Sequence, residues 1–144
     1  MHFPLSKYAK LVSGIILLSV PTIMYGGLTL LGLLMNGTAG FSPGSISLND
    51  AQSALWRAGH AHAGVWVILS LVLQILIDAT NLNKRWEWTA RTAAPLAAVA
   101  TPAGFFGLAF APAFRWLLYF GGLCLLASVV ITGVGLILNR RDEA

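Results

Sequence analysis

The sequence predicts an all-α integral membrane protein, folded as one four-helix bundle over residues 1–144. Two observations carry this prediction. Hydrophobic residues make up 57% of the 144 residues and charged residues only 10%, whereas soluble domains carry about 25% charged residues. Four segments are also long enough to cross a bilayer, which takes roughly 20 apolar residues each. With a mean hydropathy of +0.76, the chain has too little polar surface for water, and its length suits a single domain.

The first apolar segment, residues 11–35, follows Lys7 and Lys10 as a secretory signal would. A signal's apolar region is only about 7–15 residues long, so we expect a retained helix, kinked at Pro21. The second segment covers residues 54–77. Asn49 and Gln52 precede it in a pattern typical of a helix cap.

The third segment, residues 92–113, contains prolines and glycines, which are tolerated where neighbouring helices pack closely in lipid. The fourth covers residues 116–138, after a tight connection near Pro112 and Arg115. A longer glycine-rich loop, residues 36–53, joins the first two segments.

The distribution of basic residues predicts the orientation. Seven of the nine Lys and Arg residues fall on one side of the predicted bundle: Lys7, Lys10, Lys84, Arg85, Arg91, Arg140 and Arg141. Positive charge favours the cytoplasmic side, so we expect both termini in the cytoplasm and the protein in the bacterial inner membrane. The net charge of +4 forms no basic stripe that would suit a nucleic acid.

Arg57, His60 and His62 begin the second span, in the stretch WRAGHAHAGVW. Ionisable groups inside a membrane are costly and point to function. Positions i and i+2 are about 200° apart on a helix, so the two histidines face different ways and one shared metal is excluded. His60 lies on the face of Arg57 and the small residues Ala63 and Gly64, which would admit a flat cofactor. His62 shares the bulkier face of Trp66.

Zinc sites need three or four protein ligands, whereas haem iron needs one or two. A histidine without a nearby cysteine or carboxylate therefore favours haem. Arg57, together with Arg115 on the same side of the bundle, would pair with an anionic group of the cofactor.

At these residues the chain resembles the styrene oxide isomerase family of small four-helix membrane enzymes. The resemblance rests on a few short matches along most of the chain: Pro43-Gly44-Ser45, Trp56, Arg57, His60-Ala61-His62-Ala63-Gly64, Thr89-Ala90-Arg91 and Gly104-Phe105-Phe106. It implies a homotrimer that binds haem b between subunits. It also implies a small apolar substrate and an epoxide-to-aldehyde isomerisation in which ferric haem acts as a Lewis acid.

The resemblance gives two candidates for the axial haem ligand. Counting from Trp56 selects His60, while the family's His-x-Gly pattern selects His62. The face of small residues favours His60. The family has an asparagine six residues after this ligand, where the present chain has Trp66 or Ile68, and a tyrosine where it has Phe106.

Three hypotheses follow from these observations: an isomerase-like haem enzyme; a haem protein without catalysis, used in electron transfer, gas sensing or haem handling; and a structural membrane protein without a cofactor.

Overall fold

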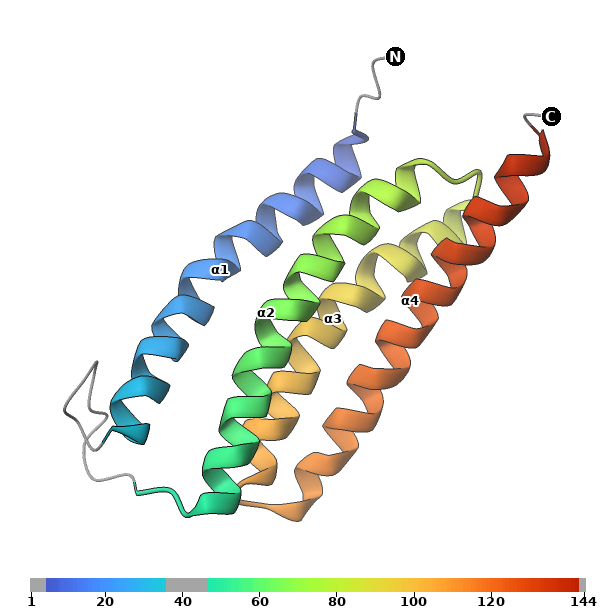
Figure 1. Cartoon of the computed structure of the whole chain (residues 1–144). Coiled ribbons are helices and arrows are strands. Elements are labelled where there is room, and N and C mark those ends of the chain that lie inside the picture. Colours follow the sequence, from blue (N-terminus) through green and yellow to red (C-terminus); the bar gives the residue numbers. More distant parts are fainter. Residues whose placement is uncertain (1–4, 36–46, 143–144) are drawn as a thin grey trace.

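The computed structural model describes residues 5–35 and 47–142, and all its regular elements are helices. They are α1 (Lys7–Leu34), α2 (Asp50–Asp78), α3 (Lys84–Leu108), the short 3-10 helix η1 (Pro112–Phe114) and α4 (Arg115–Asp142). Consecutive long helices run in opposite directions (Figure 1). The start of α1, the α2–α3 connection and the end of α4 therefore lie at one end of the bundle. The prediction of an all-helical bundle is confirmed.

A polar side chain caps the start of each of the first three helices. The Ser6 hydroxyl accepts a hydrogen bond from the backbone N–H of Ala9, at 3.1 Å. Asn49 and Gln52 form the predicted capping box, each side chain accepting from the other's backbone N–H. Asn83 caps α3. These caps satisfy N–H groups that have no partner within the helix.

Three helical segments are long and apolar enough to cross a membrane: Lys7–Leu34, Asp50–Asp78 and Pro112–Asn139. Helix α3 is not among them, and it also differs from the predicted span of residues 92–113. It begins eight residues earlier, at Lys84, because Asn83 caps it there, and it ends at Leu108, before Pro112 opens η1. Charged residues in its first two turns lower its hydropathy.

Helix α3 is the central element of the bundle. It packs extensively on both α2 and α4, whereas α1 packs mainly on α2 and barely touches α3. Alanines form much of its buried surface, for example Ala90, Ala94 and Ala97, which are fully buried. Small side chains let helix backbones approach closely in lipid. Close packing through small side chains therefore places a helix of modest hydropathy at the centre of the bundle.

A polar network of buried or partly buried side chains joins α1, α2 and α3 at the end of the bundle where α1 begins and α4 ends. Arg91 is only 1% exposed and pairs with Asp78 and with Glu87, the latter at 3.1 Å between Nε and Oε1. Asp78 also accepts hydrogen bonds from the backbone N–H and hydroxyl of Ser6, at 2.7 and 2.9 Å. Gln74, fully buried, donates to the Arg91 carbonyl at 2.9 Å. Buried charges are stable only with such partners.

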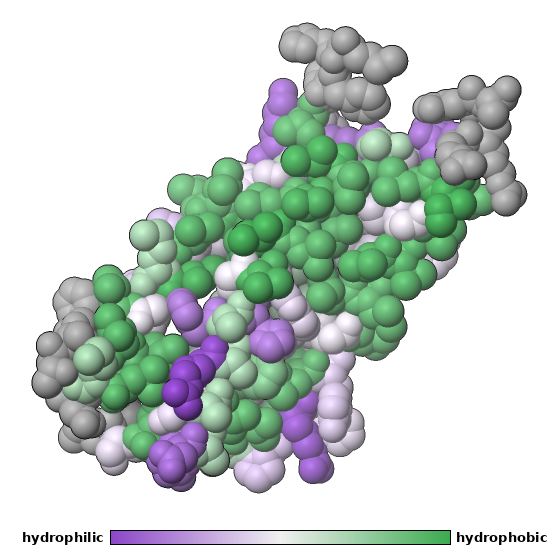
Figure 2. Space-filling view, in the orientation of Figure 1, coloured by the Kyte–Doolittle hydropathy of each residue, from purple (hydrophilic) through white to green (hydrophobic). Residues whose placement is uncertain are grey.

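The surface is apolar over most of its area. In Figure 2, hydrophobic residues cover most of the visible face, and hydrophilic residues gather towards the two ends of the bundle. Large hydrophobic side chains such as Leu18 and Val99 are 80% and 71% exposed. Soluble monomers rarely expose contiguous apolar patches of this extent. The molecule is therefore a helical membrane protein.

Candidate histidine sites on α2

His60 and His62 lie on different sides of α2, as their spacing predicts. His60 lines a cavity of about 390 Å³ between α1, α2 and α3, together with Ala63 and Val67. His62 lines a separate, smaller groove of about 150 Å³ with Ala61, Val65 and Trp66. No single metal ion can be held by both rings. Within the described residues, no group of three or more His, Cys, Asp or Glu side chains is placed to hold a metal ion.

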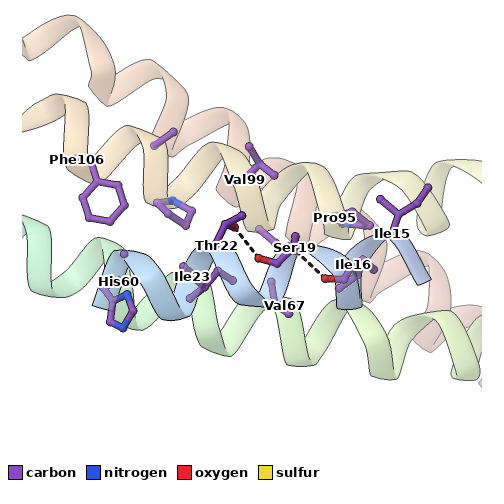
Figure 3. Close-up of a pocket in the computed structure, with 15 residues that line it drawn as sticks. Ile15, Ile16, Ser19, Thr22, Ile23, His60, Val67, Pro95, Val99 and Phe106 are labelled. Atoms are coloured by element: carbon purple, nitrogen blue, oxygen red, sulfur yellow. Dashed lines mark hydrogen bonds between the residues drawn. The ribbon is translucent and has the colours of Figure 1, made fainter. Parts of the chain in front are cut away.

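The cavity beside His60, which we call the His60 cavity, has an almost entirely apolar lining. In Figure 3, His60 and Phe106 lie at one end of it and Pro95, Ile15 and Ile16 at the other. The remaining lining residues are Ser19, Thr22, Ile23, Gly26, Ala63, Val67, Ala98, Val99, Pro102 and Ala103. None of these described residues is charged.

The His60 cavity opens sideways between α1 and α3. Ile15 on α1 and Val99 on α3 both line it, yet they are 61% and 71% exposed. We call these two residues the mouth. Because α1 and α3 barely touch, the mouth opens on the apolar flank of the bundle and on neither of its polar ends.

The imidazole of His60 packs against the backbone of α1 at Gly27. A Cβ atom added to Gly27 would lie 2.9 Å from both Cε1 and Nε2 of the ring, which is too close for real atoms. Within the described residues, the His60 ring makes no hydrogen bond. Its Nε2 edge therefore faces α1 closely, and nothing fixes its tautomer.

The imidazole of His62 is held by its own helix. Its Nδ1 lies 2.7 Å from the carbonyl oxygen of Ala58, and a carbonyl only accepts, so Nδ1 must carry the hydrogen. In a neutral ring Nε2 then has the free lone pair. The ring also packs on Phe105, at 4.8 Å between centroids, and on Trp66, at 5.5 Å.

These contacts fit a metal ligand better at His62 than at His60. Ligating histidines usually donate their second ring N–H to a carbonyl or carboxylate, which fixes the ring and the tautomer. His62 has this bond, and its groove is flanked by the short side chains of Ala61 and Val65. The donor set, one oriented imidazole among apolar and aromatic groups, suits an axial haem ligand. The preference that small neighbours give to His60 is thus outweighed by the fixed orientation of the His62 ring.

Both arginines of the predicted site are exposed. Arg57 lies near the start of α2, one turn before Ala61, and Arg115 is the first residue of α4. The starts of α2 and α4 lie at the same end of the bundle (Figure 1). The Arg115 guanidinium lies over the ring of Trp116, 5.5 Å from its centroid. Neither arginine lines the His60 cavity or the His62 groove.

The three positions that correspond to the isomerase family's polar residues lie apart. Ile68 is 64% exposed on the outward face of α2, while Trp66 packs on His62. Phe106 lines the His60 cavity and contacts Trp56, at 5.4 Å between centroids. Of these three side chains only the indole of Trp66 has a hydrogen-bonding group, and Trp66 lines the His62 groove.

Sequence reasoning missed the polar network around Arg91. Arg91 was counted only among the basic residues of the predicted cytoplasmic side, and its burial and its pairing with Asp78 were not predicted. The sequence did contain one signal of this network. Gln74, Asp78 and Arg91 are polar residues near helix ends that meet at the same end of the bundle.

Comparison with known proteins adds no relative, because no family model, curated protein or solved structure matches this chain.

Proposed function

We propose that this protein is an integral membrane protein that binds haem b, with His62 as the axial ligand. The observation that carries the proposal is the hydrogen bond of His62 Nδ1 to the Ala58 carbonyl. It leaves the lone pair of Nε2 free in a neutral ring, and the imidazole lines the groove formed with Ala61 and Val65. The resemblance to the styrene oxide isomerase family supports the same cofactor, since its His-x-Gly pattern falls on His62 and Gly64.

The groove beside His62 is shallow, at about 150 Å³, so it would take only part of a cofactor. The rest would lie against a second copy of the chain, in agreement with the homotrimer that the resemblance implies. Arg57 and Arg115, exposed at the same end of the bundle, are the residues that we assign to the haem propionates. Guanidinium groups form paired hydrogen bonds with carboxylates.

We propose further that all four helices cross the bacterial inner membrane, with both termini in the cytoplasm. Arg91 is buried and does not act as a surface anchor. The remaining basic residues on its side, among them Lys7, Lys10 and Lys84, still exceed Arg57 and Arg115 on the other. The bias towards a cytoplasmic position therefore persists.

The activity that we propose is epoxide-to-aldehyde isomerisation of a small apolar substrate. Bound ferric haem would supply the Lewis acid for this reaction. The supporting observation is that His60 and His62 lie on different sides of α2. His60 therefore cannot supply a second ligand to a haem held by His62 in the same chain, and a position on the iron would remain for the substrate. What this chain itself contributes is one fixed imidazole and an apolar wall that excludes water.

A second candidate, a haem protein without catalysis, is favoured by a different observation. Ile68 and Phe106 stand where the family has its asparagine and tyrosine, and neither offers a hydrogen-bonding group. Electron transfer, gas sensing or haem handling would need no such group.

The absorption spectrum of the purified protein tests these proposals together. The haem proposal predicts a Soret band, and the isomerase proposal predicts that added imidazole or cyanide shifts it and that an aryl epoxide yields an aldehyde. A low-spin spectrum that ignores added ligands, without turnover, would favour the non-catalytic haem protein. A colourless protein that remains folded after both histidines are replaced by alanine would leave only the structural role.

A further inference from the structure

The His60 cavity plays no part in the proposed haem site, because it lies on the other side of α2. We propose that it is a separate binding site for a small apolar alcohol dissolved in the membrane, which enters through the mouth between Ile15 and Val99. The volume of the cavity, its lining, its polar groups and its opening support this assignment, and none of these four features depends on a bound haem.

The volume and the lining define an apolar ligand. About 390 Å³ lies within the roughly 300–1,000 Å³ of small-molecule sites. Ser19 and Thr22 line it, but their hydroxyls donate to backbone carbonyls of their own helix, both at 2.6 Å (Figure 3). No charged group among the described lining residues would compensate an ionic ligand, and uncompensated charge is costly in such surroundings.

Besides the Ser19 and Thr22 oxygens, which can still accept a hydrogen bond, two further polar groups remain for the ligand. The first is the His60 ring, which makes no hydrogen bond among the described residues. The second is the carbonyl of Ala98, because Pro102, four residues later, has no N–H to donate to it, and both residues line the cavity. The other proline in the lining, Pro95, differs, since Gln74 donates to the Arg91 carbonyl that it leaves free.

A hydroxyl group suits both of these groups, because it can donate to a carbonyl or to an unprotonated ring nitrogen and can accept from a ring N–H. A hydrocarbon that filled the cavity would bury these groups without a partner, and an unpaired buried polar group is costly. The chemistry of the site therefore favours an apolar molecule with one hydroxyl.

The opening defines the route. Ile15 and Val99 lie well inside α1 and α3, away from both ends of the bundle, and their exposed side chains are aliphatic. A ligand that enters between them comes from the hydrocarbon layer of the membrane and does not pass through water.

Binding of radiolabelled 2-naphthol to the full chain in lipid nanodiscs tests the proposal, with naphthalene as the probe that lacks the hydroxyl and empty nanodiscs as the lipid control. We expect saturable binding at one probe per chain, above the lipid background. Replacing His60 by alanine should weaken 2-naphthol binding about fivefold, the effect of one hydrogen bond, and should leave naphthalene binding unchanged.

A matched pair of variants on α3 tests the route. Val99→Trp places an indole at the mouth and should slow 2-naphthol uptake at least fivefold. Leu96→Trp changes a residue of the same helix that is 51% exposed but does not line the cavity, and uptake should stay as in the unchanged protein.

Absence of saturable 2-naphthol binding would overturn the proposal. This holds also if the cause is a lipid chain that fills the cavity permanently. Equal slowing by both tryptophan variants, or equally tight binding of the charged 2-naphthol-6-sulfonate, would overturn the apolar route. Because the assay reads the probe and not haem absorbance, these results are distinguishable from failure of the haem proposal.

Discussion

Individual ionisable residues in this chain have two kinds of surroundings. Arg91 is buried and bound to Asp78, Glu87 and Gln74, whereas Arg57 and Arg115 are exposed. A buried charge that has lost its partner is strongly destabilising, while an exposed one costs little. The network around Arg91 therefore serves to attach the start of α1 to α2 and α3, and the exposed arginines remain available to bind a ligand.

Replacing Arg91 by leucine should lower the free energy of unfolding by about 3–5 kcal/mol, because Asp78 and Glu87 lose their buried partner. Chemical denaturation in detergent measures this change. Arg85→Leu is the control, since Arg85 is exposed on the same helix and should change stability by only about 0.5 kcal/mol. Equal effects of the two variants would contradict the role given to Arg91.

The sequence predicted some of these residues well and others poorly. The spacing of His60 and His62 was sufficient to place them on different faces, because helix geometry alone decides it. It could not show that His62 binds the Ala58 carbonyl or that Gly27 packs on His60, since the first depends on a rotamer and the second on a contact between helices. Gln74 taken alone carried no interpretable signal, because its partner Arg91 is 17 residues away, and only the combination with Asp78 and Arg91 pointed to the network.

At the level of helices, the contact between α3 and α4 depends on the absence of a side chain at Gly121. A Cβ added there would lie 2.2 Å from the Thr101 hydroxyl oxygen and 3.0 Å from the Thr101 backbone nitrogen. The backbone cannot move without separating the two helices. Gly122, its neighbour in sequence, has no atom within 4 Å of an added Cβ.

This pair of adjacent glycines gives a matched test of helix packing. Gly121→Ala should destabilise the protein by about 1–3 kcal/mol, as overpacking does. Gly122→Ala should be neutral or stabilising by up to about 1 kcal/mol, because alanine favours helix. Thermal unfolding in detergent compares them, and a smaller loss for Gly121→Ala than for Gly122→Ala would contradict the close packing of α3 on α4.

Helix existence was predictable for all four elements. The predicted span began at residue 54, four residues after α2 begins, but the predicted cap at Asn49 marks the true start. The start of α3 was predicted too late, because charged residues were taken as a connection when Asn83 in fact begins a helix that buries Arg91. Hydropathy alone underestimates a helix whose surface is alanine and whose charges are paired internally.

For the whole molecule, the packing of α3 between α2 and α4 bears on how many helices cross the membrane. Helix α3 is less apolar than its neighbours, but it is enclosed by α2 and α4. A helix that faces protein on most sides need not be strongly hydrophobic to cross a bilayer. We therefore expect four crossings.

Topology reporters test this expectation. A fluorescent protein fused after residue 81 or after the C-terminus should fold in the cytoplasm, and alkaline phosphatase fused after residue 111 should be active outside it. If α3 did not cross, the reporters after residues 81 and 111 would lie on the same side. The orientation that the charge bias predicts is what these reporters test.

The sequence could not predict the sideways opening of the His60 cavity, because the opening depends on how far α1 stands from α3.

The central claim, that His62 on α2 is the axial ligand of a haem, is tested most directly by the Soret absorbance of two purified variants. We predict that His62→Ala removes the band and that His60→Ala retains it at the wild-type ratio of haem to protein. A band lost in His60→Ala and kept in His62→Ala would contradict the assignment and move the cofactor to the His60 cavity.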